Sequence, residues 1–214
     1  GLGFANKYRG TDNVALAYFG DGAANQGQVY EAFNMASLWD LPVVYVIENN
    51  MYAMGTSVAR HASETELYKR GISFEIEGEE VDGMDVMAVR EAGEKAVKYA
   101  RSGKGPYILE MKTYRYRGHS MSDPAKYRKR EEVDDIRSHH DAIEGLKGQL
   151  LELGHASEDE LKNIDKEIKG IVKEAADYSL ESPEPDPPEL WTDVLKDIEV
   201  ACCQERKHLV CPPS

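Results

Sequence analysis

The sequence predicts an α/β fold in which helices flank a parallel sheet, followed by a C-terminal helical segment. Two apolar runs, "VALAYF" at 14–19 and "LPVVYVI" at 41–47, are typical of strands buried on both faces of a sheet. Between them, apolar residues recur at helical spacing over residues 25–39. A strand, a glycine turn, a helix and a second strand form a βαβ unit, which implies that the two strands are parallel.

The pattern continues to residue 128. Residues 51–72 predict a loop with one short helix, and residues 74–81 alternate weakly, as a strand would. Apolar residues at helical spacing from Val86 to Ala100 predict a helix that ends near Gly103, and residues 107–114 predict another strand. Polar residues with glycine and proline then indicate a loop. We therefore expect residues 1–128 to form one α/β domain.

The composition changes after this domain. Residues 1–128 hold 15 basic and 17 acidic residues, whereas residues 129–199 hold 9 and 21. One helix is predicted between Ile143 and Leu153, and Ser157 with Glu160 forms a capping-box signature for the next. The stretch "SPEPDPPE" indicates a rigid linker. We expect an acidic helical extension at 129–182, a Pro-rich linker and terminal segment at 183–195, and a tail at 196–214.

The bulk properties exclude several classes of protein. A net charge of −13 argues against a general nucleic-acid binder, and no apolar run approaches the length of a membrane span. Cys202, Cys203 and Cys211 all lie in the last thirteen residues, which is no disulfide framework and suits a reducing compartment. The start lacks a methionine and the layout of a secretory signal, so we expect a fragment of a longer chain.

Polar groups follow both predicted strands of the βαβ unit. Gly20, Asp21 and Gly22 follow the first strand, and Asn50 follows the second. The carboxyl ends of neighbouring parallel strands meet at one edge of the sheet, where ligands bind. Glycines let the backbone approach phosphate, and a helix that starts near Ala24 would direct N–H groups at it.

The same groups suit a metal ion. Mg²⁺ prefers oxygen ligands, and Asp21 offers a carboxylate, Asn50 an amide oxygen and Tyr52 a backbone carbonyl. Each turn alone is more often an ordinary surface turn, but the pair at successive strand ends favours a site. A P-loop nucleotide binder is excluded because no GxxxxGK[ST] motif is present.

A family resemblance extends this interpretation. "GDG", then 26 residues, then "NN" resembles the thiamine diphosphate motif. The longer stretches "YAMGTSVAR", "VDGMD", "SGKGPYILEMKTYRYRGHSMSDP" and "REEVDDIR" resemble the alpha subunit of the pyruvate dehydrogenase first component, a thiamine diphosphate-dependent 2-oxo acid dehydrogenase. The resemblance runs from about Gly1 to Leu195. It implies a thiamine diphosphate-binding fold that is incomplete at its N-terminus, with a tail that has no counterpart.

The resemblance also implies roles for individual residues. Mg²⁺ would be held by Asp21, Asn50 and the carbonyl of Tyr52. His119, in "RYRGHSMSDP", would be a catalytic residue in the active-site loop and would contact the diphosphate; spacing alone favours a solvent-exposed loop histidine. The positions implied at thiamine diphosphate are Gly20, Asp21, Gly22, Ala23, Asn50, Tyr52 and His119.

Two serines match positions that are phosphorylated in mitochondrial relatives, namely Ser120 and Ser57. The third such serine has no counterpart, because "DPAKYR" is one residue shorter, as expected of a bacterial sequence. Ordinary polar loop residues remain the alternative. Arg115, Arg128 and other cations make this loop basic, which suits either attraction of anionic substrate and acidic lipoyl domains or balance against the acidic segment 129–199.

The implied activity is oxidative decarboxylation of pyruvate with reductive acetylation of lipoyl groups. The implied partners are a beta subunit, in an α2β2 heterotetramer, and a lipoyl-bearing acetyltransferase core. The implied location is the bacterial cytoplasm, with the mitochondrial matrix as the alternative. A branched-chain 2-oxo acid or acetoin dehydrogenase and a non-catalytic assembly subunit are the competing functions. Groups that activate the cofactor lie upstream of Gly1 and on the beta subunit, so we expect this stretch alone to be inactive.

Overall fold

The computed structural model describes residues 1–192. The chain divides into two units, and the boundary between them in the sequence lies between Ala156 and Ser157. The expected tail at 196–214, with its three cysteines, and the end of the expected segment 183–195 lie outside the described residues. The division expected at residues 128, 182 and 195 stays a prediction.

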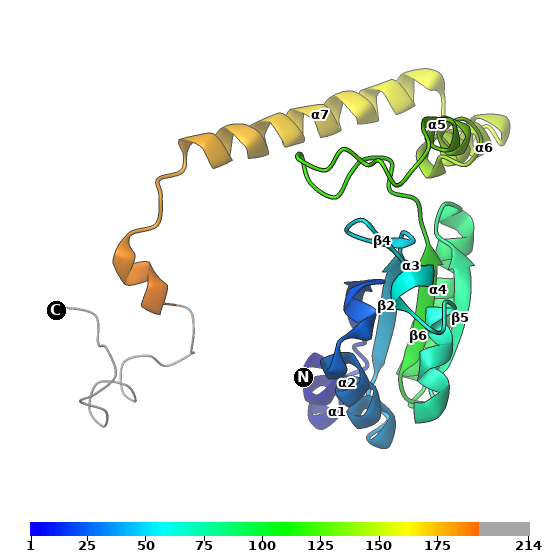
Figure 1. Cartoon of the computed structure of the whole chain (residues 1–214), viewed down its shortest axis with the longest axis vertical. Helices are drawn as coiled ribbons and strands as arrows, with labels where there is room; N and C mark the ends of the chain where they lie inside the picture. Colours follow the sequence, from blue (N-terminus) through cyan, green and yellow to red (C-terminus); the bar gives the residue numbers. More distant parts are fainter. Residues whose placement is uncertain (193–214) are drawn as a thin grey trace. The chain divides into compact units, whose positions relative to one another are not determined.

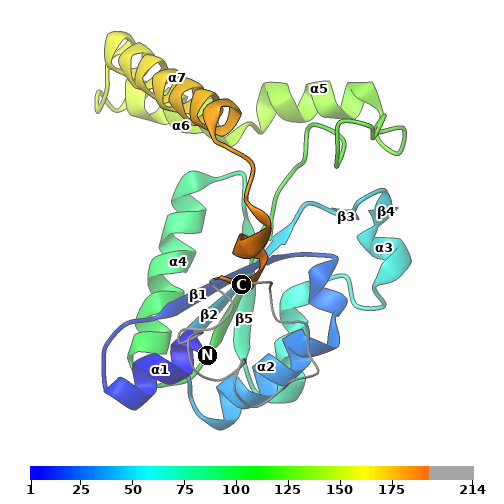
Figure 2. The same ribbon diagram turned by 90° about the vertical axis from the view of Figure 1, so that its left-hand side faces the viewer.

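A parallel sheet forms the centre of the first unit (Figures 1 and 2). Among the described residues it has four strands in the order β1-β2-β6-β5, and every neighbouring pair is parallel. The predicted α/β class with a parallel sheet is therefore confirmed. The strands are β1 (Ala15–Gly20), β2 (Val43–Asn49), β5 (Glu77–Asp82) and β6 (Tyr107–Lys112), and a separate antiparallel hairpin pairs β3 (Tyr52–Ala53) with β4 (Thr56–Ser57).

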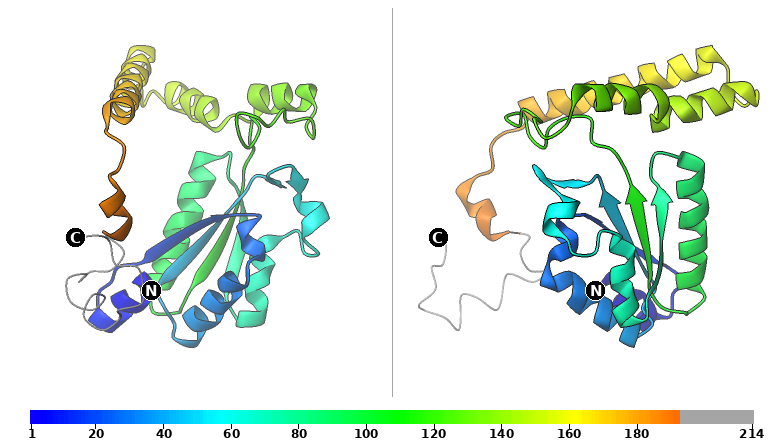
Figure 3. Two further views of the ribbon diagram at one scale, coloured as in Figure 1. Left: turned by 60° about the vertical axis from the view of Figure 1, so that its left-hand side comes forward. Right: turned by 45° about the vertical axis from the view of Figure 1, so that its right-hand side comes forward.

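Helices cover both faces of this sheet (Figure 3). On one face, the ring of Phe33 lies 4.7 Å from the ring of Tyr45, between centroids. On the other face, Ala96 packs with Val44 and Leu109, because a small side chain lets the helix approach the sheet closely. The first face is covered by α2 (Gly27–Leu38), α3 (Val58–His61) and the 3-10 segment η2 (Leu67–Phe74), and the second by α4 (Val86–Arg101).

The first strand differs from its prediction. We expected residues 14–19 to be buried on both faces, but Leu16 is 51% exposed and Tyr18 is 63% exposed. Phe19 packs into the core cluster that includes α2, whereas α4 packs with β2, β5 and β6. One face of β1, at the edge of the described sheet, therefore remains uncovered.

Several helices and strands also differ from their predictions. Phe74 ends η2 and Glu75 adopts a left-handed φ of 57°, so β5 begins later than the predicted residue 74. Helix α1 (Leu2–Arg9) was not predicted, and α5 (Arg130–His139) lies within the helical extension expected at 129–182, although no separate helix was predicted there. The first contains glycine and has a weak apolar stripe, and the second is mostly charged, so neither offers a clear helical pattern.

The remaining helices follow their predicted signals. Asp141 accepts hydrogen bonds from the first backbone N–H groups of α6 (Ala142–Glu152), and Gly154 ends that region with a φ of 66°. In the second unit, Ser157 and Glu160 form the predicted capping box of α7 (Glu158–Glu181). A 3-10 segment, η3 (Pro187–Trp191), follows it. No helix within residues 1–192 is long and apolar enough to cross a membrane.

Candidate functional site

Two buried oxygen atoms that accept no hydrogen bond from the described residues lie at the carboxyl ends of neighbouring strands. Asp21 follows β1 and Asn50 follows β2, and the two strands are paired in parallel up to these ends. The side-chain atoms Oδ2 of Asp21 and Oδ1 of Asn50 are buried and accept no hydrogen bond from the described residues. Buried polar atoms normally have partners, so such atoms indicate a missing ligand. A carboxylate and an amide oxygen fit a hard divalent cation.

The turn after β1 is packed against the β3–β4 hairpin. A Cβ atom added to Gly22 would lie 2.8 Å from the Cβ atom of Ala53, so only glycine fits this close approach. Tyr52, whose carbonyl is an expected metal ligand, belongs to the same hairpin. Its carbonyl oxygen lies 3.5 Å from Nη1 of Arg115, which is a long and weak hydrogen bond. The fold thus brings the glycine turn and the segment after β2 together.

No group of three or more His, Cys, Asp or Glu that could hold a metal ion occurs within residues 1–192. The candidate site has one carboxylate, from Asp21, and depends otherwise on amide and carbonyl oxygens. Such a sparse protein set suits Mg²⁺, which commonly keeps water and substrate phosphate as its other ligands.

The helix after the glycine turn begins later than predicted. Residues 23–25 form a 3-10 turn, η1 (Ala23–Asn25), and α2 starts only at Gly27. Gln26 separates them because its backbone is extended, with φ −75° and ψ 142°. The side chain of Gln26, the N-cap residue, makes no capping hydrogen bond to α2. The expectation of a helix from Ala24 was therefore wrong.

Sequence reasoning missed one residue of this region. His61, at the end of α3, places Nε2 at 3.6 Å from Oδ2 of Asp21. Its other ring nitrogen, Nδ1, lies 2.9 Å from the side-chain nitrogen of Asn25. Forty residues separate His61 from Asp21, and the segment between 51 and 72 has no periodic pattern. Only the placement of α3 beside the glycine turn reveals the contact.

The loop of residues 115–128 is folded around Asp123. Its carboxylate accepts hydrogen bonds from the backbone N–H of His119 at 2.8 Å, the backbone N–H of Ala125 at 2.9 Å and the hydroxyl of Tyr127 at 2.7 Å. These bonds, and first that from His119, hold the pKa of Asp123 below its usual value. A Cβ atom on Gly118 would lie 2.4 Å from the carbonyl oxygen of Asp123, so this position requires glycine.

Two arginines attach loop 115–128 to the segment after β2. Arg128 donates from Nη2 to the carbonyl oxygen of Asn50 at 2.7 Å, and its guanidinium lies 4.7 Å from the ring centroid of Tyr52. Arg115 donates from Nη2 to the carbonyl oxygen of Met54 at 2.6 Å. These two cations are therefore engaged by their own chain, and the loop of His119 lies against the segment that holds Asn50.

The other predicted loop residues are more accessible. His119 is exposed, and its Nδ1 atom lies 3.4 Å from Nη1 of Arg115. Ser120 is also exposed, with its hydroxyl 3.0 Å from that of Ser122. Ser57 is half-buried and directly precedes α3. Catalytic and phosphorylation roles for these three residues stay predictions.

Comparison with known proteins identifies the family. Residues 1–188 match the family model described as dehydrogenase E1 component. The chain belongs to this family. A pyruvate dehydrogenase E1 component subunit alpha from Rhizobium meliloti is 65% identical over 195 residues, which are 91% of this chain and 56% of the relative. The chain spans about half the length of the curated relatives it matches.

Further relatives carry similar names. A subunit alpha of the same E1 component from Zymomonas mobilis is 57% identical over 91% of this chain and 55% of its own length. A mitochondrial somatic form from Sus scrofa is 53% identical over 86% of this chain and 47% of its own length. The family resemblance drawn from the sequence is therefore confirmed.

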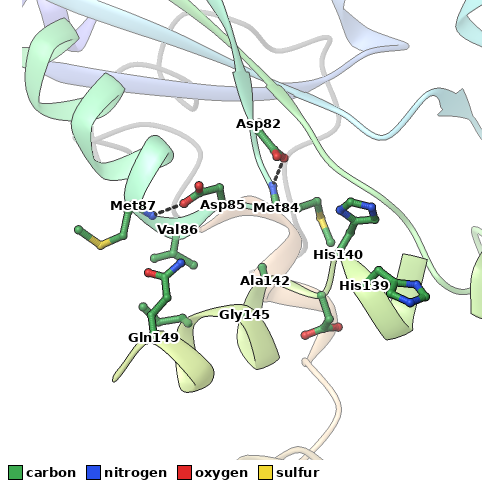
Figure 4. A pocket seen from close by; sticks show the side chains of 12 residues that line it. Asp82, Met84, Asp85, Val86, Met87, His139, His140, Ala142, Gly145 and Gln149 are labelled. Carbon is green, nitrogen blue, oxygen red and sulfur yellow. Dashed lines mark hydrogen bonds between the residues drawn. The ribbon is translucent and has the colours of Figure 1, made fainter. Parts of the chain in front are cut away.

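A cavity of about 180 Å³ lies elsewhere in the chain, between the β5–α4 turn and helices α5 and α6 (Figure 4). Its lining includes none of the predicted site residues. The carboxylates that line it already accept hydrogen bonds: Asp82 from the backbone of Met84, Asp85 from that of Met87, and Asp141 from the start of α6. These side chains stabilise a turn and two helix ends, which explains their presence without a ligand.

Removal of the Asp123 carboxylate tests how loop 115–128 is held. In Asp123→Ala we expect the amide hydrogens of His119 and Ala125 to exchange several-fold faster, because both lose their acceptor. Asp134→Ala, on the exposed surface of α5, is the control and should leave this loop unchanged. The pKa of Asp123 is lowered in the folded loop, so the ionised carboxylate stabilises the folded loop. This stabilisation is present when the pH is above 3.8, the ordinary pKa of the group, and is lost as the pH falls below that value. Equal exchange in variant and control would contradict the assignment.

Proposed function

We propose that this chain belongs to the alpha subunit of a pyruvate dehydrogenase and binds Mg²⁺ together with the diphosphate of thiamine diphosphate. The observation that carries the proposal is the pair of buried oxygens on Asp21 and Asn50, at neighbouring strand ends, which accept no hydrogen bond from residues 1–192. Their chemistry suits a divalent cation, and a cation at the carboxyl edge of a parallel sheet suits a phosphate ligand. Relatives named as pyruvate dehydrogenase subunits support the choice of enzyme.

The residues have separate roles in this proposal. Asp21, Asn50 and the carbonyl of Tyr52 bind Mg²⁺. Gly20, Gly22 and Ala23 contact the diphosphate, and the missing side chain at Gly22 leaves the turn close to the hairpin. Thiamine diphosphate, when bound, stabilises the negative charge left when a 2-oxo acid loses CO₂. His119 acts from loop 115–128, whose contact with the Asn50 segment supports a position near the diphosphate.

The wider setting is also part of the proposal. The substrate is pyruvate, and the acetyl group passes to lipoyl groups on an acetyltransferase core. The partner is a beta subunit, in an α2β2 heterotetramer that completes the cofactor site. The bacterial cytoplasm is the proposed location, which bacterial relatives support, and the mitochondrial matrix is the alternative. Phosphorylation at Ser120 or Ser57 would add roughly −1.5 to −2 charges close to an anionic cofactor, which would oppose its binding.

The proposal predicts metal-dependent cofactor binding. Titration of thiamine diphosphate into the full-length alpha chain assembled with its beta subunit should release heat and saturate when Mg²⁺ is present. Chelation of the metal should abolish this signal. Steady-state rates should be higher with pyruvate than with 3-methyl-2-oxobutanoate; the reverse order would indicate a branched-chain enzyme. An assembled protein that binds no thiamine diphosphate would favour the assembly-subunit alternative.

A further inference from the structure

A histidine outside the expected ligand set faces the carboxylate of Asp21. Atom Nε2 of His61 lies 3.6 Å from Oδ2 of Asp21, and the two side chains are 17% and 2% exposed. Neither atom has a hydrogen-bond partner among the described residues, and both are buried. This distance is longer than a hydrogen bond but within the range of an ion pair. The contact therefore brings a ring nitrogen to the carboxylate that is the proposed metal ligand.

A second contact indicates which ring nitrogen carries the proton. The side-chain amide nitrogen of Asn25 lies 2.9 Å from Nδ1 of His61. An amide nitrogen only donates, so Nδ1 accepts and the proton of the neutral ring lies on Nε2, which faces Asp21. Asn25 ends the 3-10 turn that follows the glycine turn, and His61 ends α3. The η1 turn, through Asn25, and helix α3, which carries His61, therefore together place the Nε2–H group opposite Oδ2 of Asp21.

We propose, on the basis of the proposed function, that His61 is a positioning residue of the metal site. Its Nε2–H group holds Oδ2 of Asp21 and thereby orients the carboxylate toward the cation, while Asn25 sets the tautomer of the ring. Side chains that bind metals are commonly held in this way by an outer hydrogen-bond partner. Among residues 1–192 no donor lies within hydrogen-bond distance of Oδ2, and Nε2 of His61, 3.6 Å away, is the ring nitrogen that faces it.

A different arrangement would place the lone pair of Nε2 on the ion itself. It requires the amide of Asn25 to be reversed, so that its oxygen accepts a proton from Nδ1. The two arrangements differ in metal preference. An imidazole ligand strengthens binding of Co²⁺ far more than binding of Mg²⁺, whereas an outer donor supports both ions through the same carboxylate.

The test measures metal affinity of the full-length alpha chain assembled with its beta subunit. Mn²⁺ is the probe, followed by electron paramagnetic resonance at saturating thiamine diphosphate, and Mg²⁺ and Co²⁺ are measured by competition. The variants are His61→Leu, which lacks a donor, and His61→Gln, which keeps an N–H group at similar size. The matched control is His155→Ala, an exposed histidine of the first unit.

We expect His61→Leu to weaken all three metals by about 10–100-fold, the usual loss for an outer partner of a metal ligand. His61→Gln should recover most of this loss. Asn25→Ala should shift the affinities in the same direction by a smaller factor. If His61→Leu does not assemble, the Asn25→Ala and His61→Gln measurements decide the question.

Three results would overturn the inference. Unchanged affinities in His61→Leu and Asn25→Ala would show that the ring does not orient Asp21. A loss confined to Co²⁺ would assign His61 as a direct ligand. A Gln variant no better than Leu would indicate packing instead of a donor. Failure of the wild-type assembly to bind Mn²⁺ with thiamine diphosphate would instead contradict the proposed function, and the role of His61 with it.

Discussion

Replacing Asp21 with asparagine is expected to eliminate Mg²⁺-dependent binding of thiamine diphosphate to the assembled enzyme. The side chain keeps its shape but loses the charge that the proposed cation requires. Asn50 and Tyr52 supply neutral oxygens, so no other charge in the proposed ligand set compensates. The affinity should therefore fall by more than the roughly 100-fold that loss of an outer partner costs.

Stability separates this effect from simple misfolding. Oδ2 of Asp21 is buried and accepts no hydrogen bond from the described part of the chain, which is unfavourable for the protein without metal. Asp21→Asn should therefore leave the Tm of the metal-free protein unchanged or raise it, while calorimetry detects no cofactor binding. Asp12→Asn, at an exposed position before β1, is the matched control and should bind normally. Normal metal-dependent binding by Asp21→Asn would contradict the ligand assignment.

The meeting of Asp21 with Asn50 could be predicted because it depends on local rules. The apolar runs at 14–19 and 41–47 and the helix between them require parallel strands, and parallel strands bring their carboxyl ends to one edge. No further knowledge of the fold was needed to bring these two residues together. The exposure of Leu16 and Tyr18 could not be predicted, because an apolar strand looks the same wherever it lies in the sheet.

The contacts of His61 and of loop 115–128 depend on tertiary packing. His61 lies in a segment without periodicity, so nothing in its neighbourhood indicates Asp21 as a partner. The loop was expected to be basic, either to attract anionic substrate and acidic lipoyl domains or to balance the acidic segment 129–199. Arg115 and Arg128 instead donate to backbone carbonyls of Met54 and Asn50, which a count of charges cannot reveal. Sequence patterns predict which residues lie at the carboxyl edge of the sheet, whereas tertiary packing determines which side chains contact them.

A buried carboxylate in β6, that of Glu110, stabilises the segment that follows β2 at the carboxyl edge of the sheet. Glu110 is completely buried, and both of its oxygens are engaged. Oε1 accepts from the side-chain amide of Asn49 at 2.7 Å and pairs with Lys112 at 2.7 Å, while Oε2 accepts from the backbone N–H of Tyr68 at 3.0 Å. Asn49 in turn accepts from the backbone N–H of Met51 at 2.9 Å. Glu110 therefore connects the core to the segment that contains Asn50 and Tyr52.

Replacing Glu110 with alanine should lower the free energy of unfolding by about 3–5 kcal/mol, because the Asn49 amide and the Tyr68 N–H lose their acceptor in the interior and Lys112 is left with its pair to the more exposed Glu80. Urea unfolding of the full-length subunit measures the change. Glu94→Ala, which breaks the exposed pair with Arg90, is the control and should cost under about 1 kcal/mol. Glu110→Gln keeps an acceptor oxygen and should lie between the two. Equal losses for Glu110→Ala and Glu94→Ala would show that water replaces the missing carboxylate, and the network would then not hold the segment after β2.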